Sequence, residues 1–219
     1  DVRNGIYLPD EDQIWIDYFT GDQYHGGQVL NNFDAPIWKL PFFVKSGAII
    51  PMWEENNTPT AIDKANRITE FWPAGSTEYT RFEDNGTYVK NDQVDVPGYG
   101  KVNEIDYGSH VSTRYTSVVK NGTATLTAEK STGTYDGYEK DKNTSFIVNV
   151  SAEPTAITAK NGDTVLTMVE KDSKEAVLNA ELNAGEFAYY YDAAPAIETY
   201  AAQGADEVAA MMEGKVSSP

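Results

Sequence analysis

Hydrophobic and polar residues alternate with a period of two along many short stretches of this chain. Residues 13–19, QIWIDYF, place Ile14 and Ile16 on one face of an extended chain, and residues 67–72, RITEFW, alternate in the same way. Because successive side chains of a strand point to opposite faces, both stretches predict half-buried β-strands. Further strands are expected at 78–90 (two runs), 110–119, 122–128, 144–150, 154–160, 163–169, 175–179 and 186–191.

Turn residues separate these runs. Asn-Gly pairs stand at 85–86, 121–122 and 161–162, each between two strand-like stretches. Asn and Gly tolerate the positive φ angles of tight hairpin turns, so a hairpin is predicted at each pair, most clearly within 78–90, EYTRFEDNGTYVK. Many short strands with hairpin turns and no interleaved helices favour an all-β fold of antiparallel sheets packed as a sandwich.

Residues 26–52 have the highest apolar content and yet contain Pro36, Pro41 and Pro51. Proline is excluded from central strands but is accepted at edges, strand starts and bulges. The pieces PIWKLP, FFVKSG and AIIP are therefore predicted to be short strands bent at prolines, with their apolar sides packed into a core.

The chain changes character at two places. Residues 54–66, EENNTPTAIDKAN, are polar and contain a proline, which predicts a domain boundary there. Residues 196–219 are rich in alanine, carry Val208, Met211 and Met212 at helical spacing, and end in KVSSP. They predict a helix followed by a linker.

Composition argues against several kinds of partner and site. The chain has 219 residues and a net charge of −17, which disfavours nucleic acid and anionic lipid as partners. It has no cysteine, so disulfides, thiolate metal sites and cysteine nucleophiles are excluded. The sequence shows no signal peptide and no apolar run of the length that a membrane span needs, so membrane insertion is not expected.

No constellation for catalysis stands out. His25 and His110 are the only histidines, and no metalloprotease, nucleophile-elbow or phosphate-loop motif appears. Carboxylates cluster at Asp10-Glu11-Asp12 and Glu83-Asp84, with Asp141 in a charged loop, but none has the spacing of a calcium loop. We therefore expect no catalytic, cofactor-binding or metal-binding residue, and calcium stays open only as an alternative.

Aromatic residues leave a second alternative open. A flat ring can stack on the apolar face of a sugar, although packing in the core or in turns is the favoured explanation for any single ring. Exposure and coplanarity of the rings would distinguish these readings. The rings in or near predicted loops are Trp53, Trp72, Tyr99, Tyr107, Tyr135 and Tyr138.

The first 52 residues contain an ordered series of landmarks: Tyr7-Leu8-Pro9, Trp15, Asp17-Tyr18, Thr20-Gly21, Gly26-Gly27, Pro41 to Val44 and Gly47 to Pro51. In this order they resemble glycoside hydrolase family 31, the α-glucosidases, α-xylosidases and related α-glucosyltransferases. The resemblance is to the segment that follows the catalytic barrel. Phe82 to Tyr88, FEDNGTY, resembles a hairpin of the family's distal C-terminal domain, and residues 137–162 resemble its closing strands.

The resemblance implies two antiparallel β-sandwich domains, a proximal one at 1–65 and a distal one at 66–195, followed by the helix and linker of 196–219. It places the two catalytic aspartates of the retaining reaction in the barrel, so none of them maps onto this chain, which should be inactive alone. The implied role is a non-catalytic C-terminal portion that stabilises the barrel of the same parent chain. The alternatives are a module that binds α-glucan through exposed aromatics and a cell-surface structural module. We expect an exported bacterial protein, with a cytoplasmic location left open.

Overall fold

The computed structural model describes residues 2–36, 39–54, 58, 65–86, 92–104 and 108–193. The predicted helix and linker of 196–219 lie outside these ranges, as does Tyr107. The chain divides into two compact units, one of residues 1–46 with 150–219 and one of residues 47–149. The domain boundaries expected near residues 65 and 195 stay predictions. Within the described ranges, no helix is long and apolar enough to cross a membrane.

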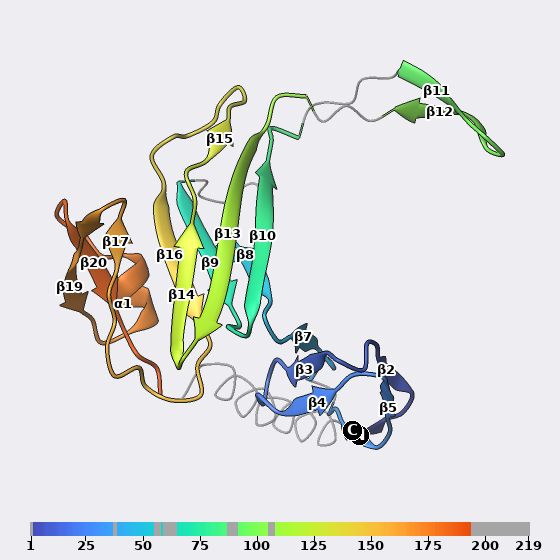
Figure 1. Cartoon of the computed structure of the whole chain (residues 1–219), viewed down its shortest axis with the longest axis horizontal. Helices are drawn as coiled ribbons and strands as arrows, with labels where there is room; N and C mark the ends of the chain where they lie inside the picture. Colours follow the sequence, from blue (N-terminus) through green and yellow to red (C-terminus); the bar gives the residue numbers. More distant parts are fainter. Residues whose placement is uncertain are drawn as a thin grey trace, which may run out of the picture. The chain divides into compact units, whose positions relative to one another are not determined.

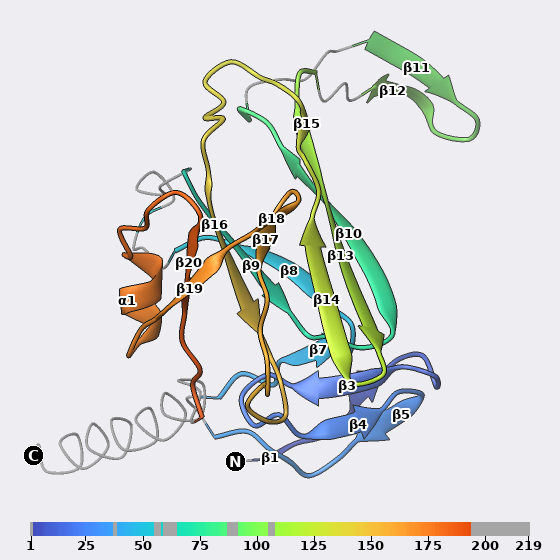
Figure 2. The same cartoon turned by 60° about the vertical axis from the view of Figure 1, so that its left-hand side comes forward.

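Residues 2–46, here called the N-terminal segment, form small antiparallel sheets (Figures 1 and 2). β1 pairs with β6, β2 pairs with β5, and β3 lies between β4 and β7. Leu8, Ile16, Phe33, Ala35 and Val44 are buried beneath them. The strands are β1 (Val2–Arg3), β2 (Ile6–Leu8), β3 (Ile14–Asp17), β4 (Gln23–His25), β5 (Gln28–Leu30), β6 (Phe33–Asp34) and β7 (Phe43–Lys45).

A close backbone approach explains the Gly26 landmark. A Cβ on Gly26 would lie 1.9 Å from the carbonyl oxygen of Asp10 and 2.3 Å from that of Pro9. Real Cβ atoms do not come this near to backbone, so only glycine lets β4 pass the turn that follows β2.

Among the described residues of 47–149, here called the sandwich unit, are two larger sheets and the two-stranded sheet β11-β12 (Figures 1 and 2). One larger sheet has the order β16-β9-β8, and the other has the order β10-β13-β14 with β15 also paired to β13. Phe71 and Ile49 from the first sheet pack with Tyr115 from the second, and Leu126 and Ala128 complete this core. The strands are β8 (Ile49–Met52), β9 (Asn66–Phe71), β10 (Ser76–Glu83), β11 (Asp92–Val96), β12 (Gly100–Glu104), β13 (Val111–Lys120), β14 (Thr123–Ala128), β15 (Thr132–Gly133) and β16 (Asn143–Val148).

This arrangement confirms the all-β, sandwich-type fold class. Antiparallel pairing dominates, but β16 pairs with β9 in parallel. Pro51 lies in β8, the edge strand of its sheet, where the missing N–H of proline is tolerated. The hairpin at Asn121-Gly122 is confirmed, with φ of 50° and 75° between β13 and β14.

The hairpin at Asp84-Asn85-Gly86 is only partly described. The turn chemistry is present, since Asp84 Oδ1 accepts from the Gly86 amide at 2.9 Å and Gly86 has φ of 68°. The expected second run, residues 87–90, lies outside the described residues. Along its whole length β10 pairs with β13, from Ser76 opposite Val118 to Glu83 opposite Val111.

Residues 150–193, here called the C-terminal segment, depart most from expectation. The predicted hairpin at Asn161-Gly162 is present between β17 and β18, whereas β19 and β20 pair in parallel and α1 lies between them in the chain. The elements are β17 (Lys160–Asn161), β18 (Thr164–Val165), β19 (Thr167–Glu170), α1 (Lys174–Leu178) and β20 (Glu186–Tyr189).

Two strand predictions in this segment are wrong. Residues 175–179 were expected to be a strand, but Lys174–Leu178 form α1. Ser173 caps it by accepting from the Ala176 amide at 3.1 Å, and Glu175 lies in the first turn, where a carboxylate favours a helix. The strand expected at 154–160 shrinks to Lys160–Asn161, because only those two residues find a ladder partner.

Candidate functional site

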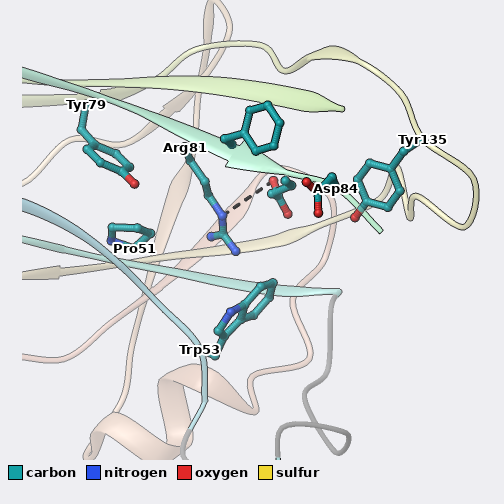
Figure 3. Close-up of a pocket in the computed structure, with 8 residues that line it drawn as sticks. Pro51, Trp53, Tyr79, Arg81, Asp84 and Tyr135 are labelled. Carbon is teal, nitrogen blue, oxygen red and sulfur yellow. Dashed lines mark ion pairs between the residues drawn. The ribbon is translucent and has the colours of Figure 1, made fainter. Parts of the chain in front are cut away.

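The sandwich unit contains a hollow of about 310 Å³ near the ends of β8 and β10 (Figure 3). Tyr79, Arg81 and Glu83 reach it because they occupy alternate positions of β10 and so share one face of that strand. Pro51 and Trp53 come from β8 and the residue after it. The lining residues are Pro51, Trp53, Tyr79, Arg81, Phe82, Glu83, Asp84 and Tyr135, referred to below as the hollow.

Arg81 is the central cation of the hollow. Its guanidinium carbon lies 4.5 Å from the centroid of the Trp53 ring, a cation–π contact. Its Nε lies 3.7 Å from Glu83 Oε2, an ion pair longer than a hydrogen bond. Figure 3 shows the Arg81 side chain pointing from β10 toward Trp53, with Asp84 on one side of it and Tyr135 farther out beyond Asp84.

One nitrogen of this guanidinium has no hydrogen-bond partner among the described residues. Arg81 is only 4% exposed, and this atom, its Nη1, is buried. An unsatisfied buried donor costs about 1–3 kcal/mol, more when it is charged. An unpaired atom of this kind, in a side chain that lines a hollow, is therefore the strongest chemical signal in this part of the chain.

Glu83 is held by a second arginine. Arg67 Nη2 donates to Glu83 Oε2 at 2.8 Å, and both side chains are 7% exposed. Burial alone lowers the pKa of Arg67, but Glu83 and Tyr138 raise it, and the pKa ends above its ordinary value. Burial, and then Glu83, raise the pKa of Tyr135, which keeps its hydroxyl protonated at neutral pH.

The rings singled out from the sequence do not form one platform. Trp53 and Tyr135 line the hollow, and the Tyr138 ring lies 5.2 Å from that of Tyr135. Trp72 is buried at 8% exposure, whereas Tyr99 is 84% exposed in the turn between β11 and β12. This scatter counts against sugar binding along a single row of exposed rings.

Neither histidine lines the hollow, and neither does any residue of Asp10-Glu11-Asp12. The His110 ring stacks on Phe82 at 4.6 Å and its Nδ1 lies 3.0 Å from the Gly108 carbonyl, while His25 is exposed on β4. Asp10 Oδ1 accepts from the Asp12 amide at 3.3 Å. Among the residues described, no group of three or more His, Asp or Glu side chains is placed to hold a metal ion.

Sequence reasoning missed Tyr79, Arg67 and Arg81. The alternation of Tyr79, Arg81 and Glu83 along one predicted strand was a usable signal, since it places an aromatic, a cation and an anion on one face. Arg67 lies on a strand of the other sheet, so only the packing of the two sheets brings it to Glu83.

A second feature is a group of exposed apolar side chains on the N-terminal segment. Tyr7 and Val29 stand opposite each other on β2 and β5, and the ring centroid of Phe42 lies 5.1 Å from that of Tyr18. We call the following residues the exposed apolar set: Val2 (54% exposed), Tyr7 (62%), Val29 (51%), Leu40 (69%) and Phe42 (45%).

Comparison with known proteins gives these features a context. Residues 2–50 match the model of the glycosyl hydrolase family 31 C-terminal domain. The chain is 34% identical over 97 residues to the isomaltosyltransferase of Sporosarcina globispora, covering 41% of this chain and 9% of that protein. It is 28% identical over 162 residues to alpha-glucosidase 2 of Bacillus thermoamyloliquefaciens, covering 72% of this chain and 17% of that protein.

Solved structures agree at the level of the fold. The family 31 dextranase of Flavobacterium johnsoniae superposes with a TM-score of 0.54 at 20% identity, covering 79% of this chain and 19% of that one. The family 31 alpha-xylosidase of Xanthomonas citri gives 0.50 at 23% identity, covering 67% and 14%. The chain therefore spans less than a fifth of these relatives. Residues 2–50 are similar to the C-terminal domain of glycosyl hydrolase family 31, and two thirds or more of the chain shares its fold with solved structures of that family.

Proposed function

We propose that this chain is the non-catalytic C-terminal portion of a family 31 retaining α-glycosidase or α-glucosyltransferase, and that its N-terminal segment stabilises the catalytic barrel of the parent protein. The supporting observation is the exposed apolar set, which lies within the residues that match the family model. Exposed apolar side chains gathered on one segment are typical of an interaction surface.

The chemistry of the set suits packing rather than catalysis. Leu40 and Phe42 flank Pro41, whose fixed φ keeps this part of the chain from forming a regular strand. Covering these side chains would gain roughly 25 cal/mol for each Å² of apolar surface removed from water. We propose accordingly that the chain alone has no glycosidase activity, since the retaining reaction needs two suitably spaced carboxyl groups.

Two variants of the parent protein test this role. Leu40→Asp places a charge where the proposed contact is apolar, and should lower the unfolding temperature of the barrel and its activity after mild heating. Val165→Asp is the matched control, because Val165 is 60% exposed on β18, outside the exposed apolar set. Equal unfolding temperatures and activities for the two variants would contradict the stabilising role.

Carbohydrate binding through a row of exposed rings is less well supported, because Trp72 is buried while Tyr99 is exposed. The remaining proposal from the sequence is export from a bacterial cell. Its support is compositional, and detection of the parent protein in the culture medium or on the cell surface would test it.

A further inference from the structure

The hollow of the sandwich unit is lined in part by charged side chains, which a packing role does not need. We propose that it binds a neutral pyranose sugar, with Arg81 and Asp84 contacting hydroxyl groups and Trp53 and Pro51 contacting the apolar face of the ring. This inference goes beyond the stabilising role and does not depend on it, since all the lining residues belong to residues 47–149.

Arg81 has a donor that no described residue uses. A guanidinium presents five N–H groups, and Arg81 lines the hollow while its Nη1 is buried and unpaired among the described residues. The contact with Trp53 and the ion pair with Glu83 hold the group in place without satisfying this nitrogen. An oxygen atom of a ligand in the hollow would accept from it.

The charges around the hollow indicate what kind of ligand it would accept. Arg67 and Arg81 carry two positive charges, and Glu83 and Asp84 carry two negative charges, so the surroundings of the hollow are balanced. The chain as a whole carries −17, which repels anions from its surface. Both facts favour a neutral ligand over a carboxylate or a phosphate.

The lining of the hollow combines hydrogen-bond donors and acceptors. Arg81 only donates, the Asp84 carboxylate only accepts, and the hydroxyls of Tyr79 and Tyr135 can do both. Asp84 uses Oδ1 to accept from the Gly86 amide, which fixes the carboxylate at the rim. A sugar hydroxyl donates and accepts at once, and the C–H face of a pyranose is apolar, so a sugar matches each kind of group. The volume of about 310 Å³ lies at the lower end for small-ligand pockets.

The experiment is a titration of the 219-residue chain with methyl α-D-glucopyranoside, followed by protein NMR through the indole resonance of Trp53 and the amides of residues 79–84. We expect saturable shifts confined to the hollow. Asp84→Asn and Trp53→Ala should each weaken binding about tenfold, the effect of losing one charged hydrogen-bond partner or one anchor ring. Neither residue is fully buried, so both variants should fold.

Two further variants and a charged sugar test whether the shifts come from binding of a neutral sugar in the hollow. Tyr99→Ala removes an 84% exposed ring outside the hollow and should leave the affinity unchanged. Arg81→Lys keeps the charge but loses the planar fork, and should weaken binding in a sample whose amide spectrum remains folded. Sodium glucuronate at matched ionic strength should bind no more tightly than the neutral sugar.

Three results would overturn the proposal. They are the absence of saturable shifts at the hollow, an affinity that Asp84→Asn and Trp53→Ala leave unchanged, and tighter binding of glucuronate than of the neutral sugar. None of them bears on the stabilising role, which Leu40→Asp tests in the parent protein.

Discussion

Arg67 on β9 and Glu83 on β10 form an ion pair of 2.8 Å that joins the two sheets of the sandwich unit. Both side chains are 7% exposed, and Arg67 also lies 3.4 Å from the hydroxyls of Tyr138 and Ser131. A buried ion pair stabilises the fold little more than well-packed apolar residues in its place would. Removing one partner, however, leaves an uncompensated buried charge. The pair therefore fixes how the sheets meet near the hollow.

Glu83→Ala should lower the free energy of unfolding by about 3–5 kcal/mol, because Arg67 would remain buried without its anion. Urea unfolding followed by circular dichroism measures the change. Glu78→Ala is the matched control on the same strand, since Glu78 pairs with Arg114 at 67% exposure and should change stability by at most about 1 kcal/mol. A similar loss for both variants would show that burial does not decide the effect.

Asp17 should matter for the N-terminal segment by the same reasoning. It is 1% exposed, its Oδ2 lies 2.8 Å from Lys39 Nζ, and its Oδ1 accepts from the Phe19 amide at 2.9 Å. Asp17→Ala leaves both donors unpaired and should cost about 3 kcal/mol in a urea titration. Asp22→Ala, at an exposed neighbour that contacts Thr20, should cost less than about 1 kcal/mol. Equal costs would contradict a structural role for the Asp17 landmark.

Gly26→Ala should destabilise the chain through a steric clash. The added Cβ would lie 1.9 Å from the Asp10 carbonyl oxygen, and backbone must move to relieve it, at a cost of about 2–3 kcal/mol. Gly21→Ala is the comparison, because Gly21 has φ of 76° and open space around it, so only backbone strain of about 1 kcal/mol applies. Thermal unfolding should rank Gly26→Ala below Gly21→Ala, and the reverse order would show that the turn relaxes freely.

Stability should fall at alkaline pH. Burial raises the pKa of Tyr24, Tyr135 and Tyr189, with carboxylates nearby adding to the effect, above the ordinary value of 10.0. A group whose pKa is raised in the folded state contributes stability below its unfolded pKa and loses it as pH rises through the folded one. The free energy of unfolding should therefore be level up to about pH 10 and decline above it.

Tyr135→Phe isolates one part of this decline. Without the hydroxyl at residue 135, the loss of stability above about pH 10 should be shallower than in the parent sequence. Tyr99→Phe, at an exposed ring, should leave the slope unchanged. Urea titrations at a series of pH values measure both slopes, and equal slopes for the two variants would contradict the assignment to Tyr135.

Local patterns predicted most strands because alternation and turn chemistry depend on neighbouring residues. The strand at 110–119 appears as Val111–Lys120, and the Asn121-Gly122 turn follows it as expected. The pattern failed at 175–179, where apolar Ala and Val suggested a strand but the Ser173 cap and the first-turn Glu175 stabilise a short helix. Periodicity over five residues cannot separate these two states.

The sequence by itself determined the all-β class, the hairpins at Asn121-Gly122 and Asn161-Gly162, and the family resemblance carried by Tyr7 to Pro51. These features depend on residues close together in the chain. Only the tertiary structure decided that β9 pairs in parallel with β16, that Arg67 meets Glu83, and that Arg81 faces Trp53 with a nitrogen that no described residue pairs. Those contacts join residues far apart in sequence, and the packing of two sheets selects them because buried charge and apolar surface must find partners at the same time.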